Sequence, residues 1–332
     1  MNNKPILTIA IPTYNRSEFL DECLRSIVHQ IDEDIYERLE IFISDNGSTD
    51  NTYEIVQKYR DNYNIIYYKN DINMGMDVNY YNCIYMPSSK FVHLMSDDDI
   101  MLPGTIKAIL SFINFHPDTS LIHLNSCGFD KKYSQNNISN PRLKMNRDIC
   151  TKNKDEFIDW VGIYITFLST IVINRTKLFK IPNPKIYFNT HFLCSHIPLL
   201  ITKGDELMGI ISHNCIAARG GNAGGYNLYD VWVQQYKRLL LETGIIAGYS
   251  KKIMKQLFIN SLCNNIRGFI IEFRLNNTGF DLKNRKILIK YTYMYPIVWI
   301  KVYPHAFMPL GMLKKLKNLK AKLKDIIKKW RK

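Results

Sequence analysis

The stretch that decides the fold is Phe91–Gly104, which reads FVHLMSDDDIMLPG. It begins as an apolar strand and ends in three consecutive acids, Asp97, Asp98 and Asp99, before a Pro-Gly pair stops it. Adjacent carboxylates repel one another, and each is costly to bury without a partner. Ligands of open α/β sheets bind at the carboxyl ends of the strands, so we expect a cation there. Hard oxygen ligands suit Mg²⁺ or Mn²⁺, which in turn suit a diphosphate; a solvated acidic turn is the alternative interpretation of the triplet taken alone.

Around this stretch the chain alternates apolar runs with amphipathic ones. Strands are expected at residues 6–11, 39–44, 65–69 and 91–95, and helices at residues 17–28, 52–60, 78–86 and 105–115. Ser17 is expected to cap the first helix. Four successive strand-then-helix units predict a parallel, doubly wound sheet with helices on its faces.

Three of the expected strands end in unusual loops. They are PTYNR at residues 12–16, DNGSTD at residues 45–50 and SDDD at residues 96–99. In a doubly wound sheet these strand ends converge on one crevice. The chain has no GxGxxG and no Walker A loop, so the crevice does not look built for NAD or for ATP hydrolysis.

Four motifs occur in register at four strand-to-helix junctions. They are IAIPTYNR at 9–16, ISDNGSTD at 43–50, NMGxxxN at 73–79 and MSDDD at 95–99. Together they resemble the nucleotide-sugar half of family 2 glycosyltransferases, which have the GT-A fold. The resemblance is close over residues 5–115 and weaker to about residue 240, where it is similar to abequosyltransferase-like and other O-antigen or capsule transferases.

The resemblance implies a Rossmann-like, mostly parallel α/β sheet flanked by helices. It implies a GT-A domain over residues 1–245, with a nucleotide-sugar half over 1–115 and an acceptor half over 116–245. The remaining residues, 246–332, are expected to form a helical, basic, amphipathic extension.

Residue by residue, the resemblance implies a donor site built from the loops. The residues expected to frame the nucleotide sugar are Pro12, Thr13, Tyr14, Arg16, Asp45 and Asn79. Asp45 would accept a hydrogen bond from the base. The family often has an Asp-Asp pair where this chain has Asp45 and Asn46. An ordinary turn with a helix cap explains the same stretch without a ligand, and Asn79 and Arg16 could be helix-surface residues.

The acidic triplet matches the family's metal-binding DxD element, in a frame that stays open. Either Asp97 and Asp99 form the element, or Asp98 and Asp99 align with its closing pair. We expect Asp99, with Asp97, on the metal, and Asp97 or Asp98 on the ribose or a metal-bound water. A Mn²⁺ or Mg²⁺ ion there would stabilise the departing nucleoside diphosphate.

The general base that the resemblance implies has no counterpart at the expected position. Inverting members of the family use an acid of a Glu-Asp pair at the start of a later helix, and no such pair stands in residues 187–198. His196, and after it His191, is the candidate here because imidazole titrates near neutrality. A core histidine is the alternative for each.

Residues 219–225, which read RGGNAGG, form a glycine-rich loop with one cation, Arg219. Backbone N–H groups and an arginine suit closure over a diphosphate, so the loop is a candidate lid over the donor. A plain linker is the alternative.

The basic charge of the chain is concentrated at its C-terminal end. Residues 1–250 hold 24 basic and 27 acidic residues, residues 251–312 hold 10 and 2, and residues 313–332 hold 10 and 1, within a formal net charge of +14. This differs from a basic groove for nucleic acid. We therefore expect no nucleic-acid partner, although a basic amphipathic stretch could also meet RNA.

The last helix is expected to lie on an anionic membrane. Its apolar face would comprise Leu313, Leu316, Leu319, Leu323, Ile326, Ile327 and Trp330. No charge-free stretch reaches 18 residues, so a peripheral position on the inner face of a cell membrane is expected, with a lipid-linked or glycan acceptor. Docking on the protein itself or on a partner is the alternative.

The cysteines suggest a reducing compartment. There are seven, widely spaced and without a CxxC pair, so a cytoplasmic location is expected. The possible soft metal ligands fit no standard zinc spacing; they are His191, Cys194, His196, His213 and Cys215.

Two other functions stay open. A sugar nucleotidyltransferase also uses a metal and an α/β sheet, but it usually needs a Gly-rich loop with Arg and Lys after the first strand. A non-catalytic, membrane-tethered protein that binds glycans or polyanions would explain the missing Glu-Asp pair, whereas the intact acidic triplet argues against it. Catalytic turnover separates an enzyme from a binding protein.

Overall fold

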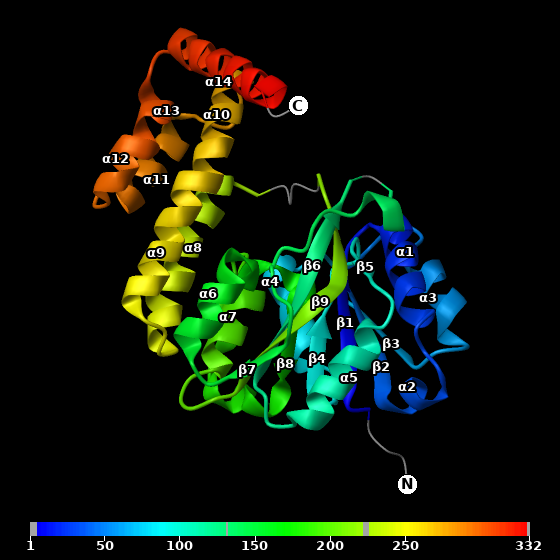
Figure 1. The fold of residues 1–332 in the computed structure, drawn as a ribbon. Helices are drawn as coiled ribbons and strands as arrows, with labels where there is room; N and C mark the ends of the chain where they lie inside the picture. The colour runs from blue at the N-terminus through cyan, green and yellow to red at the C-terminus, as the bar shows by residue number, and fades with distance from the viewer. Residues whose placement is uncertain (1–4, 131, 222–225, 331–332) are drawn as a thin grey trace. The chain divides into compact units, whose positions relative to one another are not determined.

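The computed structural model describes residues 5–130, 132–221 and 226–330, and these fold into two compact units (Figure 1). Unit 1 comprises Met1–Gly224 and Thr243–Ser250, and unit 2 comprises Gly225–Glu242 and Lys251–Lys332. Unit 1 holds the sheet and its flanking helices, and unit 2 is helical.

The described strands of unit 1 form one sheet. They are β1 (Leu7–Thr13), β2 (Leu39–Asp45), β3 (Ile65–Lys69), β4 (Phe91–Leu94), β5 (Ile100–Met101), β6 (Leu121–Phe129), β7 (Ile149–Thr151), β8 (Ile171–Asn174) and β9 (Met208–Arg219). Their order across the sheet is β3-β2-β1-β4-β8-β6-β9-β5, with β7 beside β9. β1 runs parallel to β2 and β4, β2 to β3, and β6 to β9, while β8 is antiparallel to both β4 and β6.

The helices of unit 1 cover both faces of this sheet. They are α1 (Ser17–Val28), α2 (Glu33–Arg38), α3 (Thr52–Arg60), α4 (Met76–Tyr85), α5 (Thr105–Phe115), α6 (Lys154–Val161) and α7 (Leu193–Ile201). A short 3₁₀ turn, η3 (Leu168–Thr170), precedes β8. The α/β fold class expected from the sequence is therefore confirmed.

The core explains why these residues form these elements. All seven residues of β1 are buried, as are all seven of β2, which is typical of central strands covered on both faces. Alternate residues such as Ile9 and Ile41 join one cluster with the apolar sides of α1, α3 and α5. α4 packs against β1 and β2 and, farther along the chain, against α7.

The start of α1 differs from the expectation. Its N-cap residue is Arg16, whose side chain makes no capping hydrogen bond, and Ser17 is the first helical residue. The Ser17 N–H instead donates to Asp50 Oδ2 at 2.9 Å. A carboxylate from the loop after β2 thus satisfies the helix terminus, which local sequence could not reveal.

The change from unit 1 to unit 2 also differs from the expected boundary at residue 245. Gly225–Glu242 belongs to unit 2, and Thr243–Ser250 returns to unit 1. A hydrogen bond of 2.8 Å between Thr243 Oγ1 and His196 Nδ1 helps to fix this return. Such a short return leaves no signal in the hydrophobic pattern.

Unit 2 is a set of helices rich in aromatic and basic residues. They are η6 (Asp230–Gln235), α8 (Tyr236–Arg238), α9 (Lys251–Ser261), η8 (Leu262–Ile266), α10 (Arg267–Leu275), α11 (Leu282–Thr292), α12 (Pro296–Lys301), α13 (Tyr303–Phe307) and α14 (Leu310–Trp330). α10 packs against α13 and α14, and Leu313 is buried there. Within the described ranges, none of the helices combines the length and the apolarity that crossing a bilayer requires.

Candidate functional site

The acidic triplet lies just after β4, beside the carboxyl end of β1. β4 runs alongside β1, and the chain leaves β4 with Met95 N–H donating to Ala10 O at 2.9 Å. Asp97, Asp98 and Asp99 are only 2, 7 and 3% exposed. Three carboxylates are therefore gathered, almost out of water, at the edge of the sheet where ligands bind.

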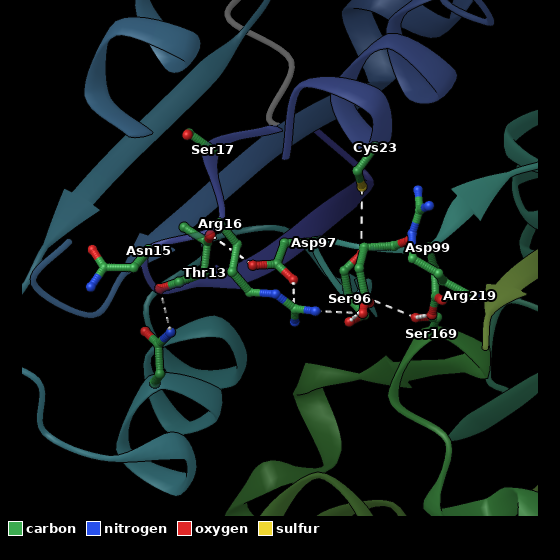
Figure 2. A network of polar contacts seen from close by, with 12 residues as sticks. Thr13, Asn15, Arg16, Ser17, Cys23, Ser96, Asp97, Asp99, Ser169 and Arg219 are labelled. Atoms are coloured by element: carbon green, nitrogen blue, oxygen red, sulfur yellow. Dashed lines mark hydrogen bonds and ion pairs between the residues drawn. The ribbon is translucent and has the colours of Figure 1, made fainter. Parts of the chain in front are cut away.

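Arg16 binds two of these acids from the loop after β1 (Figure 2). Its Nη1 donates to Asp97 Oδ1 at 3.0 Å and its Nη2 to Asp98 Oδ2 at 2.8 Å. Thr13 Oγ1 donates to Asp97 Oδ2 at 2.8 Å, and Ser96 Oγ donates to Asp98 Oδ1 at 2.5 Å. The first loop and the triplet therefore form one charged network.

Asp99 is held from more distant parts of the chain. Ser169 Oγ, in η3, donates to Asp99 Oδ2 at 2.5 Å, and the Arg219 N–H, at the end of β9, donates to Asp99 Oδ1 at 2.9 Å. Figure 2 shows both residues beside Asp99. Ser169 carries no motif, so nothing in the sequence marked it as part of this site.

The Arg219 side chain lies within the protein. Its Nε donates to the Asp98 carbonyl at 3.0 Å, and its guanidinium pairs with Glu22. The guanidinium carbon lies 4.9 Å from the centroid of the Phe19 ring and 4.8 Å from that of Phe129. This placement gives Arg219 a part in positioning the triplet. Of the candidate lid, Gly220 N–H donates to the Phe129 carbonyl at 2.8 Å, and residues 222–225 lie outside the described residues.

The electrostatics of the triplet favour a cation. Burial raises the pKa of Asp97 to about 7, in spite of the opposing charge of Arg16, and burial followed by the charge of Asp98 also raises the pKa of Asp99. The pKa of Asp97 thus stays raised beside Arg16. A divalent ion would favour the ionised carboxylates, and oxygen ligands of this kind suit Mg²⁺ or Mn²⁺.

The described residues offer such an ion only part of a coordination shell. No group of three or more His, Cys, Asp or Glu side chains among them is placed to hold a metal ion together. Mg²⁺ beside phosphates is usually bound through one or two carboxylates, with the phosphate oxygens and water completing the shell. The residues present fit a metal that arrives with a diphosphate.

The loops after β1 and β2 are tied to each other. Asn15, with a φ of 51°, receives the Thr49 N–H on its side-chain oxygen at 2.8 Å, and its own N–H donates to Ser48 Oγ at 2.8 Å. Asn15 Oδ1 thereby stands where a backbone carbonyl would close the loop. Beside it the Tyr14 side chain is 40% exposed, an aromatic surface on which a base can stack.

Asp45, at the end of β2, is completely buried. It accepts hydrogen bonds from the Ser48 N–H at 2.8 Å and from the Tyr67 hydroxyl at 2.5 Å. Burial, followed by the Asp45 carboxylate, raises the pKa of Tyr67, so the phenol stays protonated and donates. Tyr67 was not expected in the site, because β3 carries no motif.

Asn46 stands where the family often has an acid, and its hydrogen bonds explain why this chain has an amide there. Its amide nitrogen donates to Asn73 Oδ1 at 2.8 Å and to the Gly75 carbonyl at 3.3 Å. Its oxygen accepts from Asn70 Nδ2 and from the Met74 N–H, both at 3.0 Å. A carboxylate could accept the second pair but could not donate the first.

Asn79 lies beneath these loops rather than on the surface. It is buried in α4, where Oδ1 accepts from Ser44 Oγ at 2.6 Å and Nδ2 donates to the Thr13 carbonyl at 3.3 Å. It therefore joins the carboxyl ends of β1 and β2. Pro12 is likewise buried within β1.

Comparison with known proteins gives this geometry a family. Residues 8–199, more than half of the chain, match the family model described as Glycosyl transferase family 2. The chain is a family 2 glycosyltransferase. The resemblance inferred from the four motifs is therefore confirmed.

Relatives of this glycosyltransferase include two named bacterial sugar transferases. The abequosyltransferase RfbV of Salmonella typhimurium is 27% identical over 232 residues, covering 65% of this chain and 67% of RfbV. A GalNAc(5)-diNAcBac-PP-undecaprenol beta-1,3-glucosyltransferase of Campylobacter jejuni is 33% identical over 112 residues, so the match spans 33% of this chain and about a third, 35%, of that enzyme.

Solved structures share the fold of this glycosyltransferase. Residues 1–349 of S. aureus TarS, in complex with UDP-GlcNAc, superpose with a TM-score of 0.63 at 18% identity, covering 86% of this chain and 79% of that chain. A mannosyltransferase of Pyrobaculum calidifontis, in complex with GDP-Man and Mn²⁺, has a TM-score of 0.52 at 14% identity, covering 96% of this chain and 88% of that chain.

The two histidines considered as the general base of this glycosyltransferase lie in different surroundings. His196, in α7, is fully buried; Nδ1 bonds to Thr243 Oγ1, and the ring stacks on Tyr187 at 4.3 Å. The hydrogen bond to Thr243 and the stack on Tyr187 hold this ring in place, which favours a structural role for His196. His191 is half-buried just before α7, with an unusual φ of 60°.

A cavity of about 740 Å³ lies elsewhere on the transferase and does not belong to this site. It is at the amino-terminal edge of the sheet, where Lys90, Phe91 and Arg175 line it. The Arg175 guanidinium donates to the carbonyls of Ile84 and Tyr85 at 2.9 Å, ending α4. Volume alone is thus a poor guide to the chemistry here.

Proposed function

We propose that this glycosyltransferase moves a sugar from a nucleoside diphosphate sugar to a glycan or lipid-linked acceptor in bacterial surface polysaccharide synthesis. The buried acidic triplet beside the β1 loop carries the proposal, because it places carboxylates that can bind a metal ion near the exposed ring of Tyr14. The names of RfbV and of the C. jejuni enzyme, and the UDP-GlcNAc bound by TarS, support it.

The donor would lie across the loops after β1, β2 and β4. The base would stack on Tyr14 and be read by Asp45, which would share its carboxylate between Tyr67 and a base N–H. Pro12 and Thr13 would frame the nucleoside, with Asn79 holding the floor beneath them.

The acids and Arg16 would serve the phosphate side of the donor. Asp98 and Arg16 would orient the ribose and the diphosphate, and the backbone of Arg219 would keep Asp99 in place. Asp99 and Asp97 would hold Mn²⁺ or Mg²⁺, which would neutralise the charge that develops on the leaving diphosphate. The Mn²⁺ bound by the P. calidifontis mannosyltransferase supports this choice of ion.

We propose that the reaction inverts the anomeric centre. The acceptor oxygen would attack C1 of the sugar from the face opposite the diphosphate, so one bond forms as the other breaks. The acceptor must lose its proton in that step, and a protein base is therefore required. Of the two histidines, His191 is the more accessible.

The experiment is thermal stabilisation by UDP, CDP, GDP and dTDP, each with and without Mn²⁺. One nucleotide should raise the Tm in a metal-dependent way, and Asp99→Ala should abolish that rise, because a ligand that binds only the folded state stabilises it. Asp205→Ala is the matched control, since Asp205 is an exposed acid paired with Lys152 away from the triplet. If no nucleotide shifts the Tm of the unmodified protein, the proposal is wrong.

Turnover then separates the transferase from the alternatives. Release of the nucleoside diphosphate from its sugar indicates transfer. Formation of a nucleotide sugar from a sugar phosphate and a nucleoside triphosphate would instead indicate a nucleotidyltransferase. Nucleotide binding with neither reaction would indicate a binding protein.

We further propose that unit 2 lies on the anionic inner face of the cell membrane. Leu316, Leu319 and Leu323 of α14 are 39, 56 and 54% exposed, at helical spacing among lysines. The side chains of Ile326, Ile327 and Trp330 lie outside the described residues. Each basic group near an anionic surface contributes about 1 kcal/mol, and the leucines can enter the interface.

Co-sedimentation with vesicles tests this membrane proposal. The protein should bind vesicles of phosphatidylcholine with phosphatidylglycerol, and should bind phosphatidylcholine alone weakly. A Leu319→Ser and Leu323→Ser double variant should bind less. Phe115→Ser, at an apolar residue of unit 1 that is even more exposed, should bind as the unmodified protein does. Equal binding by both variants would contradict the proposal.

A further inference from the structure

A carboxylate stands at the amino terminus of α7, although α7 does not supply it. Asp77, in the first turn of α4, accepts the His191 N–H on Oδ2 at 2.9 Å and the Leu193 N–H on Oδ1 at 3.1 Å. His191 and Leu193 are each more than a hundred positions from Asp77 in the sequence, so only the fold brings the three residues together. The spacing of Asp77 in the sequence gave no sign of this.

The side chain of Asp77 is in an unusual state for an acid. It is 5% exposed, and among the described residues no Lys or Arg forms an ion pair with it. The N–H groups of His191 and Leu193 each bind one of its oxygens, and the Thr190 N–H also stabilises the charged form. A carboxylate has about four lone-pair sites, so it can accept a further proton donor. A buried carboxylate without a Lys or Arg partner is expensive to keep, and such groups gather at sites of chemistry.

The position of Asp77 connects it to the donor site. Two residues along α4, Asn79 holds the ends of β1 and β2. Three residues along, the pKa of the Tyr80 hydroxyl is raised by burial and then by the charges of Cys194, Asp77 and Asp97. Tyr80 thus lies within electrostatic reach of both Asp77 and the acidic triplet.

We propose that Asp77 is the general base that deprotonates the acceptor hydroxyl. The inference rests on the proposed function and adds the residue that the reaction still lacked. The acceptor oxygen forms its bond to C1 of the sugar while its proton moves to an Asp77 oxygen, and the C1–oxygen bond to the diphosphate breaks with its electron pair leaving on the nucleotide. Charge and atoms balance in one step.

The surroundings of Asp77 suit this role. Burial raises the pKa of Asp77, and the N–H groups of His191 and Leu193 oppose that rise, so the carboxylate is more basic than an exposed aspartate. The titratable groups that face it are Tyr80 on α4, Cys194 on α7 and His191 in the preceding turn. The Cys194 thiol stays protonated, because burial raises its pKa to about 12.

A purely structural role is the competing explanation. Asp77 caps α7 and secures a turn in which Asn189 and His191 both have a positive φ, of 64 and 60°. A cap of this kind affects stability and the local backbone. A helix cap does not make the rate of transfer depend on the ionisation of Asp77, whereas a general base does. The test measures that dependence.

The experiment compares Asp77→Asn with the unmodified protein in three measurements: the Tm, its rise with the nucleotide and Mn²⁺, and the pH profile of kcat/KM for nucleoside diphosphate release. The substrates are UDP-, CDP-, GDP- and dTDP-sugars, with water and then a bacterial lipid extract as the source of acceptor. We expect kcat to fall by about 10²- to 10⁴-fold with nucleotide binding retained. The unmodified protein should lose activity toward low pH, and that loss should be absent in Asp77→Asn.

Asp77→Ser separates the cap from the base, because a serine hydroxyl can still accept a helix N–H but cannot take a proton at neutral pH. It should restore the Tm toward that of the unmodified protein without restoring the rate. The inference is overturned if Asp77→Asn binds the nucleotide and transfers within about threefold of the normal rate, or if the acid limb persists in it and is lost in His191→Gln. If the unmodified protein binds no nucleotide and releases none, the proposed function fails first, and the inference fails with it.

Discussion

Glu206 provides a prediction whose size and sign follow directly from its contacts. It lies between α7 and β9, where Lys180 Nζ pairs with Oε1, Lys177 Nζ lies 3.0 Å from Oε2, and Ser120 Oγ donates to Oε2 at 2.5 Å. The side chain is 13% exposed. Although partial burial acts to raise it, these partners lower the pKa of Glu206 from 4.5 to about 2.

The magnitude follows from that shift. A depression from 4.5 to about 2 corresponds to at most about 3.4 kcal/mol, and residual solvent screening reduces this to about 2–3 kcal/mol. Because the folded-state pKa of this acid is lowered, the stabilisation is fully present above pH 4.5 and is lost as the pH falls toward 2. Glu206→Gln should therefore lower the free energy of unfolding by about 2–3 kcal/mol at pH 7.5.

Denaturant unfolding at a series of pH values checks this. The difference between Glu206→Gln and the unmodified protein should shrink to less than about half by pH 3. The neighbouring Asp205→Asn is the matched control, since both Asp205 and its partner Lys152 are largely exposed, and it should change stability by at most about 1 kcal/mol. A difference for Glu206→Gln that stays constant from pH 7.5 to pH 3 would refute the electrostatic reasoning.

Three further predictions concern other parts of unit 1. Asn46→Asp should lower the stability by about 1–3 kcal/mol, measured by thermal unfolding, because a carboxylate cannot donate to Asn73; an unchanged Tm would contradict this. Gly47→Ala should cost more than about 1 kcal/mol, since φ is +81° and a Cβ would lie 2.8 Å from the Ile72 carbonyl carbon; a neutral effect would show that the loop shifts freely. Burial, followed by the charge of Arg142, lowers the pKa of His123 to about 3, so below pH 6.5 the unfolded chain takes up a proton that the folded chain does not. The protein should therefore lose about 1.4 kcal/mol of stability per pH unit between pH 6.5 and 4, and His123→Leu should remove that loss. A variant whose stability falls with the same slope in acid would disprove this.

The fold was largely predictable because its signals are local. The apolar runs of β1 to β4 are short and continuous, and each is closed by Gly, Pro or Asx residues. α3 and α5 begin and end at the expected residues. Burial on both faces of the sheet, as in β1, β2 and β4, leaves a strong pattern of this kind.

The partners within the site were not predictable, because they come from distant segments without a pattern. Ser169 and the Arg219 N–H reach Asp99 from 70 and 120 residues away. Asp77 meets α7 at a similar separation. The sequence does not indicate which carboxylate or N–H a given serine or aspartate will contact, because that partner is determined by how the sheet packs.

The amides around Asn46 bear on how this loop can change by mutation. Asn46, Asn70, Asn73 and Asn82 satisfy one another, with Asn82 Nδ2 donating to Asn70 Oδ1 at 3.3 Å. Groups within one network show coupled rather than additive effects, so single replacements at these positions should each look harmful although certain combinations would be tolerated. A library of variants around Asp45, the residue proposed to read the base, therefore has to vary these four positions together. Selection of one change at a time would discard single replacements that are tolerated only in combination.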